Sequence, residues 1–162
     1  MDVIDAIRER RSIRAYTGEA IEQEDLEQML DAARRAPSAK NLQPWKFVVV
    51  IDPYVLEDLV PACRNQAFVK DAGAFIVGLI EDKKWAEIDL AIALDHLSLE
   101  AVELGYGSCW IGAFKEEALR EKLDIPEDHQ IKVCMTIGVP GESPRPPTKK
   151  TMDELVDWVE IE

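Results

Sequence analysis

Ala36-Pro37-Ser38-Ala39-Lys40-Asn41-Leu42-Gln43-Pro44-Trp45-Lys46-Phe47 joins a helical pattern to an apolar strand pattern, and we interpret the rest of the chain from this stretch. Pro37 ends the preceding helix because its ring interrupts helical hydrogen bonding, and Pro44 holds Gln43 extended before the strand begins. Between the two prolines, hydroxyl and amide side chains offer more donors and acceptors than a plain connection needs. A binding loop and an ordinary solvated turn explain this composition about equally well.

The composition fits one globular domain over residues 1–162, with 47% hydrophobic and 31% charged residues. A chain of this length buries roughly 70% of its unfolded surface when it folds. The formal net charge of -13 argues against a nucleic-acid binder or a protein that binds anionic membranes, because those surfaces require a broad basic face. No apolar run approaches the roughly 18 residues of a membrane span.

Three cysteines, Cys63, Cys109 and Cys134, are far apart and never in a Cys-x-x-Cys arrangement. This spacing indicates neither a disulfide framework nor a zinc site, so we expect reduced, buried thiols and no metal. No charged and then apolar leader precedes the first helical pattern, and we expect a cytoplasmic protein. His96 and His129 have no ligand spacing around them, and we interpret both as structural.

Apolar periodicity predicts the order of helices and strands. A short first helix, from Asp2 to about Arg11, places Val3, Ile4 and Ile7 on one face, and a last helix places Leu155, Val156 and Val159 inward. The predicted helices are 2–11, 22–35, 53–59, 85–104, 118–123 and 153–159, and the predicted strands are 48–51, 74–80 and 131–137.

The pattern from Trp85 to Leu104 is the longest, and its apolar residues cover well over half of the helical circumference. A helix of this kind lies at the centre of a domain. One domain face leaves part of such a surface in water, so we expect part of it to contact another subunit.

Basic residues gather in two short segments of this acidic chain. The first contains Arg8 and the run Arg10-Arg11-Ser12-Ile13-Arg14, where guanidinium groups and one hydroxyl follow a helix and are able to converge on a phosphate. A solvated charged face is the alternative interpretation of that run. The second segment contains Arg145, Lys149 and Lys150 in a proline-rich stretch.

Gly105-Tyr106-Gly107-Ser108-Cys109-Trp110-Ile111-Gly112 follows the longest helix. It differs from a dinucleotide-binding fingerprint because Trp110 stands where the third glycine belongs and because a helix, not a strand, precedes it. The glycines allow the backbone to approach a flat group closely, and they also suit a helix C-cap and a tight turn into a strand. Cys109 lacks a nearby histidine partner, which argues against a nucleophilic role.

Two basic clusters, a polar loop and a glycine-rich backbone strip suit one elongated ligand with a phosphate at one end and a flat heterocycle at the other. Four stretches, in this order, resemble the FMN-dependent nitroreductase family: Arg10 to Arg14, Ala36 to Trp45, Gly105 to Gly112, and Ile137-Gly138-Val139-Pro140. The resemblance covers nearly the whole chain. It implies an α+β fold with a central mixed or antiparallel sheet flanked by helices, in a homodimer that has the long helix and FMN at the subunit interface.

The resemblance also implies a role for each site residue. Arg10, Ser12 and Arg14, helped by Arg11, would hold the phosphate and ribityl chain, Lys149 and Lys150 would complete the phosphate site, and Arg145 would be a third contact. The other subunit would contribute Pro37, Ser38, Ala39 and Asn41. Asn65 and Gln66 would face the pyrimidine edge of the ring, and Ile111, Gly112 and Ala113 would line the ring, one backbone N–H lying near the flavin N5.

The activity implied by the resemblance is transfer of hydride from NAD(P)H to a small acceptor, such as a nitroaromatic, a quinone or a flavin, by a ping-pong mechanism. No catalytic side chain is required, because the cofactor performs the chemistry. The chain is short for the family: only Glu81 to Lys84 separates the second strand from the long helix, where larger members cover the flavin. A dimeric flavin-binding or carrier module with little turnover, and a binding protein for another phosphorylated ligand, are the alternatives.

Overall fold

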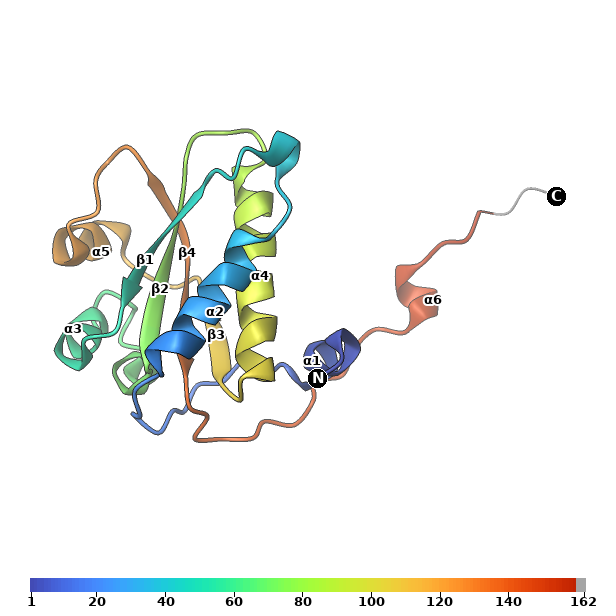
Figure 1. Cartoon of the computed structure of the whole chain (residues 1–162), viewed down its shortest axis with the longest axis horizontal. Coiled ribbons are helices and arrows are strands. Elements are labelled where there is room, and N and C mark those ends of the chain that lie inside the picture. Colours follow the sequence, from blue (N-terminus) through green and yellow to red (C-terminus); the bar gives the residue numbers. More distant parts are fainter. Residues whose placement is uncertain (160–162) are drawn as a thin grey trace.

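The structure, a computed structural model, describes residues 1–159 and contains one four-stranded sheet. Its strands are β1 (Trp45–Val50), β2 (Ala74–Ile80), β3 (Gly107–Ile111) and β4 (Gln130–Gly138), in the order β1-β2-β4-β3. Every neighbouring pair is antiparallel, as Figure 1 shows. The predicted α+β class is therefore confirmed, with a sheet that is wholly antiparallel.

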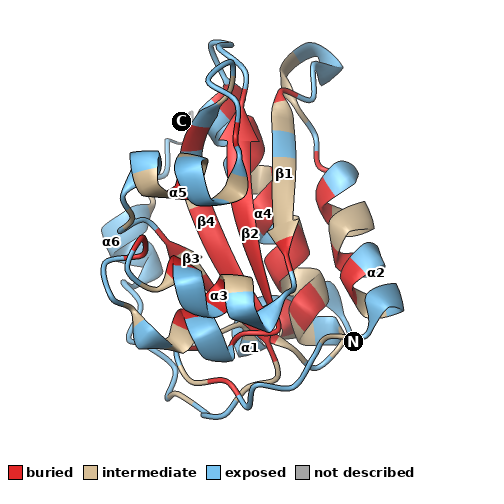
Figure 2. Cartoon of the chain, turned by 90° about the vertical axis from the view of Figure 1, so that its left-hand side faces the viewer, coloured by how far each residue is buried: buried red, intermediate tan, exposed pale blue. Residues whose placement is uncertain are grey.

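Helices cover both faces of the sheet. Helices α2 (Gln23–Arg34) and α4 (Ala86–Glu103) lie on one face, and α3 (Pro53–Leu59), η2 (Ala67–Asp71) and α5 (Glu116–Leu123) lie on the other (Figure 1). Because β2 lies between the two helical layers, all seven of its residues are buried (Figure 2). This arrangement explains the continuous apolar run, since a strand that is covered on both faces has no polar side.

The first strand begins three residues earlier than the sequence pattern predicts. Trp45 already pairs with Ile80 across the β1–β2 ladder, and Trp45 and Phe47 pack against the core between the sheet and helices α2 and α4. The prediction from Val48 followed the run of branched apolar residues and left out the aromatic positions that alternate with Lys46.

Helix α4 is the axis of the domain. One side of it carries the fully buried Leu90, Leu94 and Leu97, which pack on the sheet and on α2. The other side leaves Trp85 and Ile88 about half exposed, at 48% and 54%. The apolar surface of this helix therefore extends beyond what its own chain covers.

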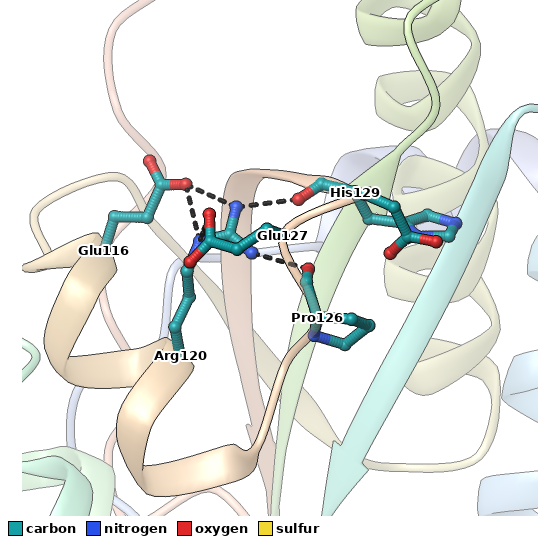
Figure 3. Close-up of polar contacts among 6 residues, drawn as sticks. Glu116, Arg120, Pro126, Glu127 and His129 are labelled. Atoms are coloured by element: carbon teal, nitrogen blue, oxygen red, sulfur yellow. Dashed lines mark hydrogen bonds and ion pairs between the residues drawn. The ribbon is translucent and has the colours of Figure 1, made fainter.

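The connection from α5 to β4 is held by one arginine. The Arg120 side chain is 11% exposed and donates to Glu116 Oε1 at 2.6 Å, to the Pro126 carbonyl at 2.8 Å and to the His129 carbonyl at 2.7 Å (Figure 3). The His129 ring contacts the Asp128 carboxylate at 2.9 Å. These contacts are of the kind that fix a loop, and they agree with the structural interpretation of His129.

Two predictions about inward-facing residues are wrong. Helix α1 (Val3–Glu9) buries Ala6, whereas the predicted face is exposed, including Val3 at 73%. Helix α6 (Met152–Leu155) is only four residues long, and Leu155 and Val159 are exposed at 62% and 93%. The proline-rich segment before α6 leads it away from the domain (Figure 1), so its apolar residues have no core to join.

Within residues 1–159, we find no helix that combines the length and the apolar character needed to cross a membrane.

Candidate functional site

A cavity lies where the end of α1 meets the proline-rich segment before α6. Its volume is about 700 Å³, within the range of ligand pockets. Both predicted basic clusters contribute to it, although more than a hundred residues separate them in the sequence. The lining cations are Arg8, Arg10, Arg11, Arg14, Arg145 and Lys149, and Ser12 adds a hydroxyl.

The first basic cluster is fixed by β3. The backbone at Ser12 forms a parallel bridge to Ser108, and the Ile13 N–H donates to the Ser108 carbonyl at 2.9 Å. Gly107 allows this close approach, because a Cβ on Gly107 would collide with the side chain of Ile13. The start of β3 therefore sets the position of the arginine run.

The second basic cluster reaches the cavity because the chain after β4 pairs with the chain after the arginine run. The Thr17 N–H donates to the Val139 carbonyl at 3.1 Å, and the Gly141 N–H donates to the Ala15 carbonyl at 2.8 Å. The Arg14 N–H donates to Glu142 Oε1 at 2.5 Å. Arg145 and Lys149 then line the cavity, whereas Lys150 does not.

Two buried polar atoms among the described residues lack a hydrogen-bond partner, Arg10 Nη1 and Ser108 Oγ, and both lie in this region. A buried donor without an acceptor is costly by about 1–3 kcal/mol, and it points to a ligand at the site. Arg11 is already engaged, because it donates to the Arg8 and Arg10 carbonyls at 2.6 and 2.8 Å. Burial raises the pKa of the nearby Cys109 thiol, while the charges of Arg14 and Arg10 lower it in part.

At the other end of β3, the segments that contain the predicted ring contacts lie together. Gln66 Nε2 donates to the Cys63 carbonyl at 2.9 Å and to the Ala113 carbonyl at 3.1 Å. Asn65 is exposed in the left-handed region, with φ 59°. Gly112 is also exposed, and a Cβ added there would meet no atom within 4 Å.

The cationic cavity lies close to one end of β3, and the exposed backbone at Gly112 follows the other end. From Ser108 to Gly112, the residue after β3, four steps of about 3.4 Å span roughly 14 Å. A distance of this order therefore separates the Ser108 end of β3, beside the arginine run, from the exposed Gly112 backbone. Ile111 itself is buried in the core, so only its backbone is available on that face.

The predicted binding loop is strained and internally hydrogen-bonded. Lys40, Asn41 and Gln43 have φ of 53°, 56° and 50°, a left-handed conformation that costs about 1 kcal/mol or more for each residue other than glycine. The prediction that Pro44 holds Gln43 extended is therefore wrong; the Gln43 N–H is instead turned toward Ser38 Oγ. Ser38 Oγ accepts from the Gln43 N–H at 2.9 Å, and the hydroxyl proton has no acceptor among residues 1–159. Pro37 and Asn41 are exposed.

Within one chain this loop does not meet the cationic cavity. The Ala39 N–H contacts Asp89, near the start of α4, while the Met1 ammonium contacts Glu103 at 2.8 Å, at the end of α4. From residue 89 to residue 103 an α-helix rises by about 21 Å. The two groups of predicted site residues therefore lie at opposite ends of α4 (Figure 1).

Sequence reasoning gave no role to two residues of the site region. Arg8 was placed in the first basic cluster without a role, and it lines the cavity. Asp89 is 5% exposed and holds the loop; its signal is an acid between the apolar residues Ile88 and Leu90 of an otherwise inward-facing pattern.

The fold and the site together define a class of protein: a three-layer α+β domain with a cation-lined cavity close to one end of the edge strand β3. The sequence model of the nitroreductase family matches residues 7–85 and 80–139, which include the arginine run, the strained loop and β3. The chain belongs to the nitroreductase family.

Solved structures and curated proteins resemble the chain over nearly its whole length. An FMN-dependent nitroreductase from Clostridium difficile R20291 is 32% identical, with 98% of this chain and 99% of that chain covered and a TM-score of 0.84. The NADPH:FMN oxidoreductase of Vibrio harveyi, in complex with NAD+, is 25% identical, with coverage of 99% and 78% and a TM-score of 0.87. An FMN reductase (NADPH) of Bacillus subtilis strain 168 is 26% identical, with coverage of 94% and 73%.

Proposed function

We propose that this protein is an FMN-dependent NAD(P)H oxidoreductase that reduces a small acceptor such as a nitroaromatic, a quinone or a flavin. One observation carries the proposal: β3 joins a cavity lined by six cations to an open backbone face at Gly112, in a chain of the nitroreductase family. The names of the similar FMN-dependent and NADPH-dependent proteins support the same cofactor and the same reductant.

The residues at the cavity fit the phosphate of FMN. A dianionic phosphate requires convergent charged donors, and guanidinium groups supply them in a planar fork. Arg10 offers a buried Nη1 that no described residue accepts from, and Arg14, Arg145 and Lys149 are exposed around the same cavity. Ser12 completes the donor set. Lys150 lies outside the cavity lining, so we assign the second cluster's contact to Arg145 and Lys149.

At the flat end, we propose that Asn65 and the backbone of Gly112 and Ala113 contact the ring. The Gln66 Nε2 donor is already used by two carbonyls, so Gln66 acts mainly by holding these two segments together. Held by these residues, FMN would supply hydride transfer between a reduced nicotinamide and the acceptor. The chain's residues bind and orient the ring, and their donors near its pyrimidine edge favour the reduced, more negative form.

We propose that two copies of the chain form each site. The loop from Pro37 to Asn41 lies about 21 Å of helix away from the cationic cavity of its own chain, so it reaches a ligand there only from a second copy. Apolar side chains on α1, on the outer side of α4 and beyond α6 are exposed and suited to such an interface. They are Val3, Ile4, Ile7, Trp85, Ile88, Met152, Leu155, Trp158 and Val159.

Cys63, Cys109 and Cys134 are all free, and all are buried within the domain. Unpaired thiols of this kind are usual in a reducing compartment, and we propose that the protein works in the cytoplasm.

The direct test of the proposed function is anaerobic reduction of the purified protein. We expect a yellow protein that releases FMN on denaturation and whose flavin absorbance bleaches when NADH or NADPH is added without air. A flavin that stays oxidised with both nucleotides would rule out the enzyme. Steady-state NAD(P)H oxidation with menadione separates an enzyme from a flavin carrier, since a carrier would show almost no turnover.

A further inference from the structure

Helix α4 carries a buried carboxylate that no described cation neutralises. Asp89 is 5% exposed, and among residues 1–159 its carboxylate has no salt-bridge partner. The Ala39 N–H donates to both oxygens, at 3.2 Å to Oδ1 and 3.3 Å to Oδ2. Burying a carboxylate costs free energy unless it is hydrogen-bonded. A carboxylate that served only solubility would lie on the surface, so the burial of Asp89 requires another explanation.

Position on the helix does not explain the burial. An acid in the first turn of α4 interacts favourably with the helix dipole, but the exposed Glu87 in the same turn does this too. Glu87 instead pairs with Lys132 at 2.9 Å, on the surface. The distinguishing feature of Asp89 is its contact with the loop, fifty residues earlier in the chain.

That contact falls at the start of the strained part of the loop. Ala39 is followed directly by Lys40 and Asn41, both left-handed, and its carbonyl accepts from the Leu42 N–H at 3.1 Å. Both backbone polar groups of Ala39 are therefore hydrogen-bonded within the chain. Ser38, beside it, keeps a free hydroxyl proton.

We propose that Asp89 is a positioning residue, which holds Ala39 so that the neighbouring Ser38 hydroxyl and Asn41 side chain keep the shape that reaches the flavin in the partner copy. The inference rests on the proposed function. Asp89 is one of the residues that line a shallow hollow of about 280 Å³, together with Pro37, Trp85 and Ile92. Because Asp89 is only 5% exposed, little water reaches its hydrogen bond to Ala39, and the low local polarity strengthens that bond.

Three variants separate positioning from a general effect on folding. Asp89→Leu removes both acceptors and keeps an apolar side chain in the hollow, and Asp89→Asn keeps one acceptor without the charge. Glu87→Leu is the matched control, because it removes an acid from the same helical turn without touching the loop. Amide hydrogen exchange is measured on the FMN-free proteins, and FMN affinity is measured separately by quenching of flavin fluorescence.

We expect the N–H groups of Ala39, Asn41 and Gln43 to exchange about tenfold faster or more in Asp89→Leu, less so in Asp89→Asn, and unchanged in Glu87→Leu. Amides of β2 should keep their protection in all three, which shows that the fold is intact. FMN affinity should fall about tenfold in Asp89→Leu. Unchanged loop exchange would overturn the positioning role, and faster exchange with unchanged FMN affinity would overturn its link to the flavin. Failure of the wild-type protein to bind FMN would instead refute the proposed function.

Discussion

Gln66 Nε2 donates to the carbonyl of Ala113 at 3.1 Å and so joins two segments that lie 47 residues apart in the sequence. One segment precedes η2 and contains the left-handed Asn65; the other follows β3 and contains Gly112. The Lys115 N–H adds a second link, to the Ala62 carbonyl at 2.7 Å. Two hydrogen bonds within the chain therefore hold together the face proposed for the flavin ring.

Replacing Gly112 with leucine should block the ring without harming the fold. Gly112 is exposed and a Cβ there meets no atom within 4 Å, so the free energy of unfolding should change by less than about 0.5 kcal/mol. It would occupy the volume that the proposal gives to the ring, so FMN should no longer copurify. Urea denaturation and the flavin content of the pure protein measure the two effects. A yellow Gly112→Leu protein would place the ring elsewhere.

Replacing Arg14 with alanine should weaken FMN binding at the phosphate end. Loss of a charged donor to a phosphate oxygen costs about 1–3 kcal/mol, or roughly 5- to 150-fold in the dissociation constant. Ser12→Ala should act in the same direction. Arg34→Ala is the control, because Arg34 is exposed on α2 and pairs with Asp31. Titration of the FMN-free proteins checks this, and equal affinities in all four proteins would mean that the phosphate binds somewhere else.

Introducing charged residues at apolar positions of the C-terminal arm, residues 143–159, should dissociate the proposed dimer. Leu155 and Trp158 are exposed at 62% and 79%, and burial of such side chains contributes about 1.5–3 kcal/mol each. The double variant Leu155→Asp, Trp158→Asp should therefore raise the dimer dissociation constant by roughly a hundredfold or more. Tyr54→Asp, at an exposed site on α3, serves as the control. Sedimentation equilibrium distinguishes the outcomes, and an intact double-variant dimer would exclude the arm from the interface.

Alkaline pH should destabilise the protein through its buried thiols. Burial raises the pKa of Cys63 from 9.0 to about 12 and also raises that of Cys134. Above pH 9 the unfolded chain loses these protons while the folded chain keeps them, so the free energy of unfolding falls as pH rises. The slope is about 1.4 kcal/mol per pH unit for each thiol. Denaturation at pH 8 and pH 10 measures it, and Cys63→Ala should show a shallower decline.

The sequence predicted the parts of the fold that depend on one chain's own core. The β2 run from Ala74 to Ile80 and the α3 segment from Pro53 to Leu59 have the predicted bounds, because each is defined by local signals: a fully apolar run in the first case and a proline after a capping aspartate in the second. The exposed faces of α1 and α6 were predicted inward, because periodicity identifies an apolar face without saying which surface covers it.

The sequence predicted which types of residue form the site, but not how they are arranged in space. Arginine, serine and glycine in the right order indicated a phosphate and a flat ligand, and the structure brings Arg14 and Lys149 to one cavity. It also separates that cavity from the Ser38 loop by most of the length of α4, a distance that no local pattern encodes. The contact between Asp89 and Ala39 was missed because hydrogen bonds between distant segments leave no periodic signal.

The most direct test of the central claim, that two copies share each flavin site, is complementation between two defective chains. One chain carries Arg10→Ala and Arg14→Ala, and the other carries Ser38→Leu and Asn41→Leu; each alone should retain no FMN. In the purified heterodimer, one site combines the intact loop of the first chain with the intact arginines of the second, so we predict one FMN per heterodimer. If each site belonged to a single chain, every site would keep a defect, and a heterodimer without FMN would contradict the account.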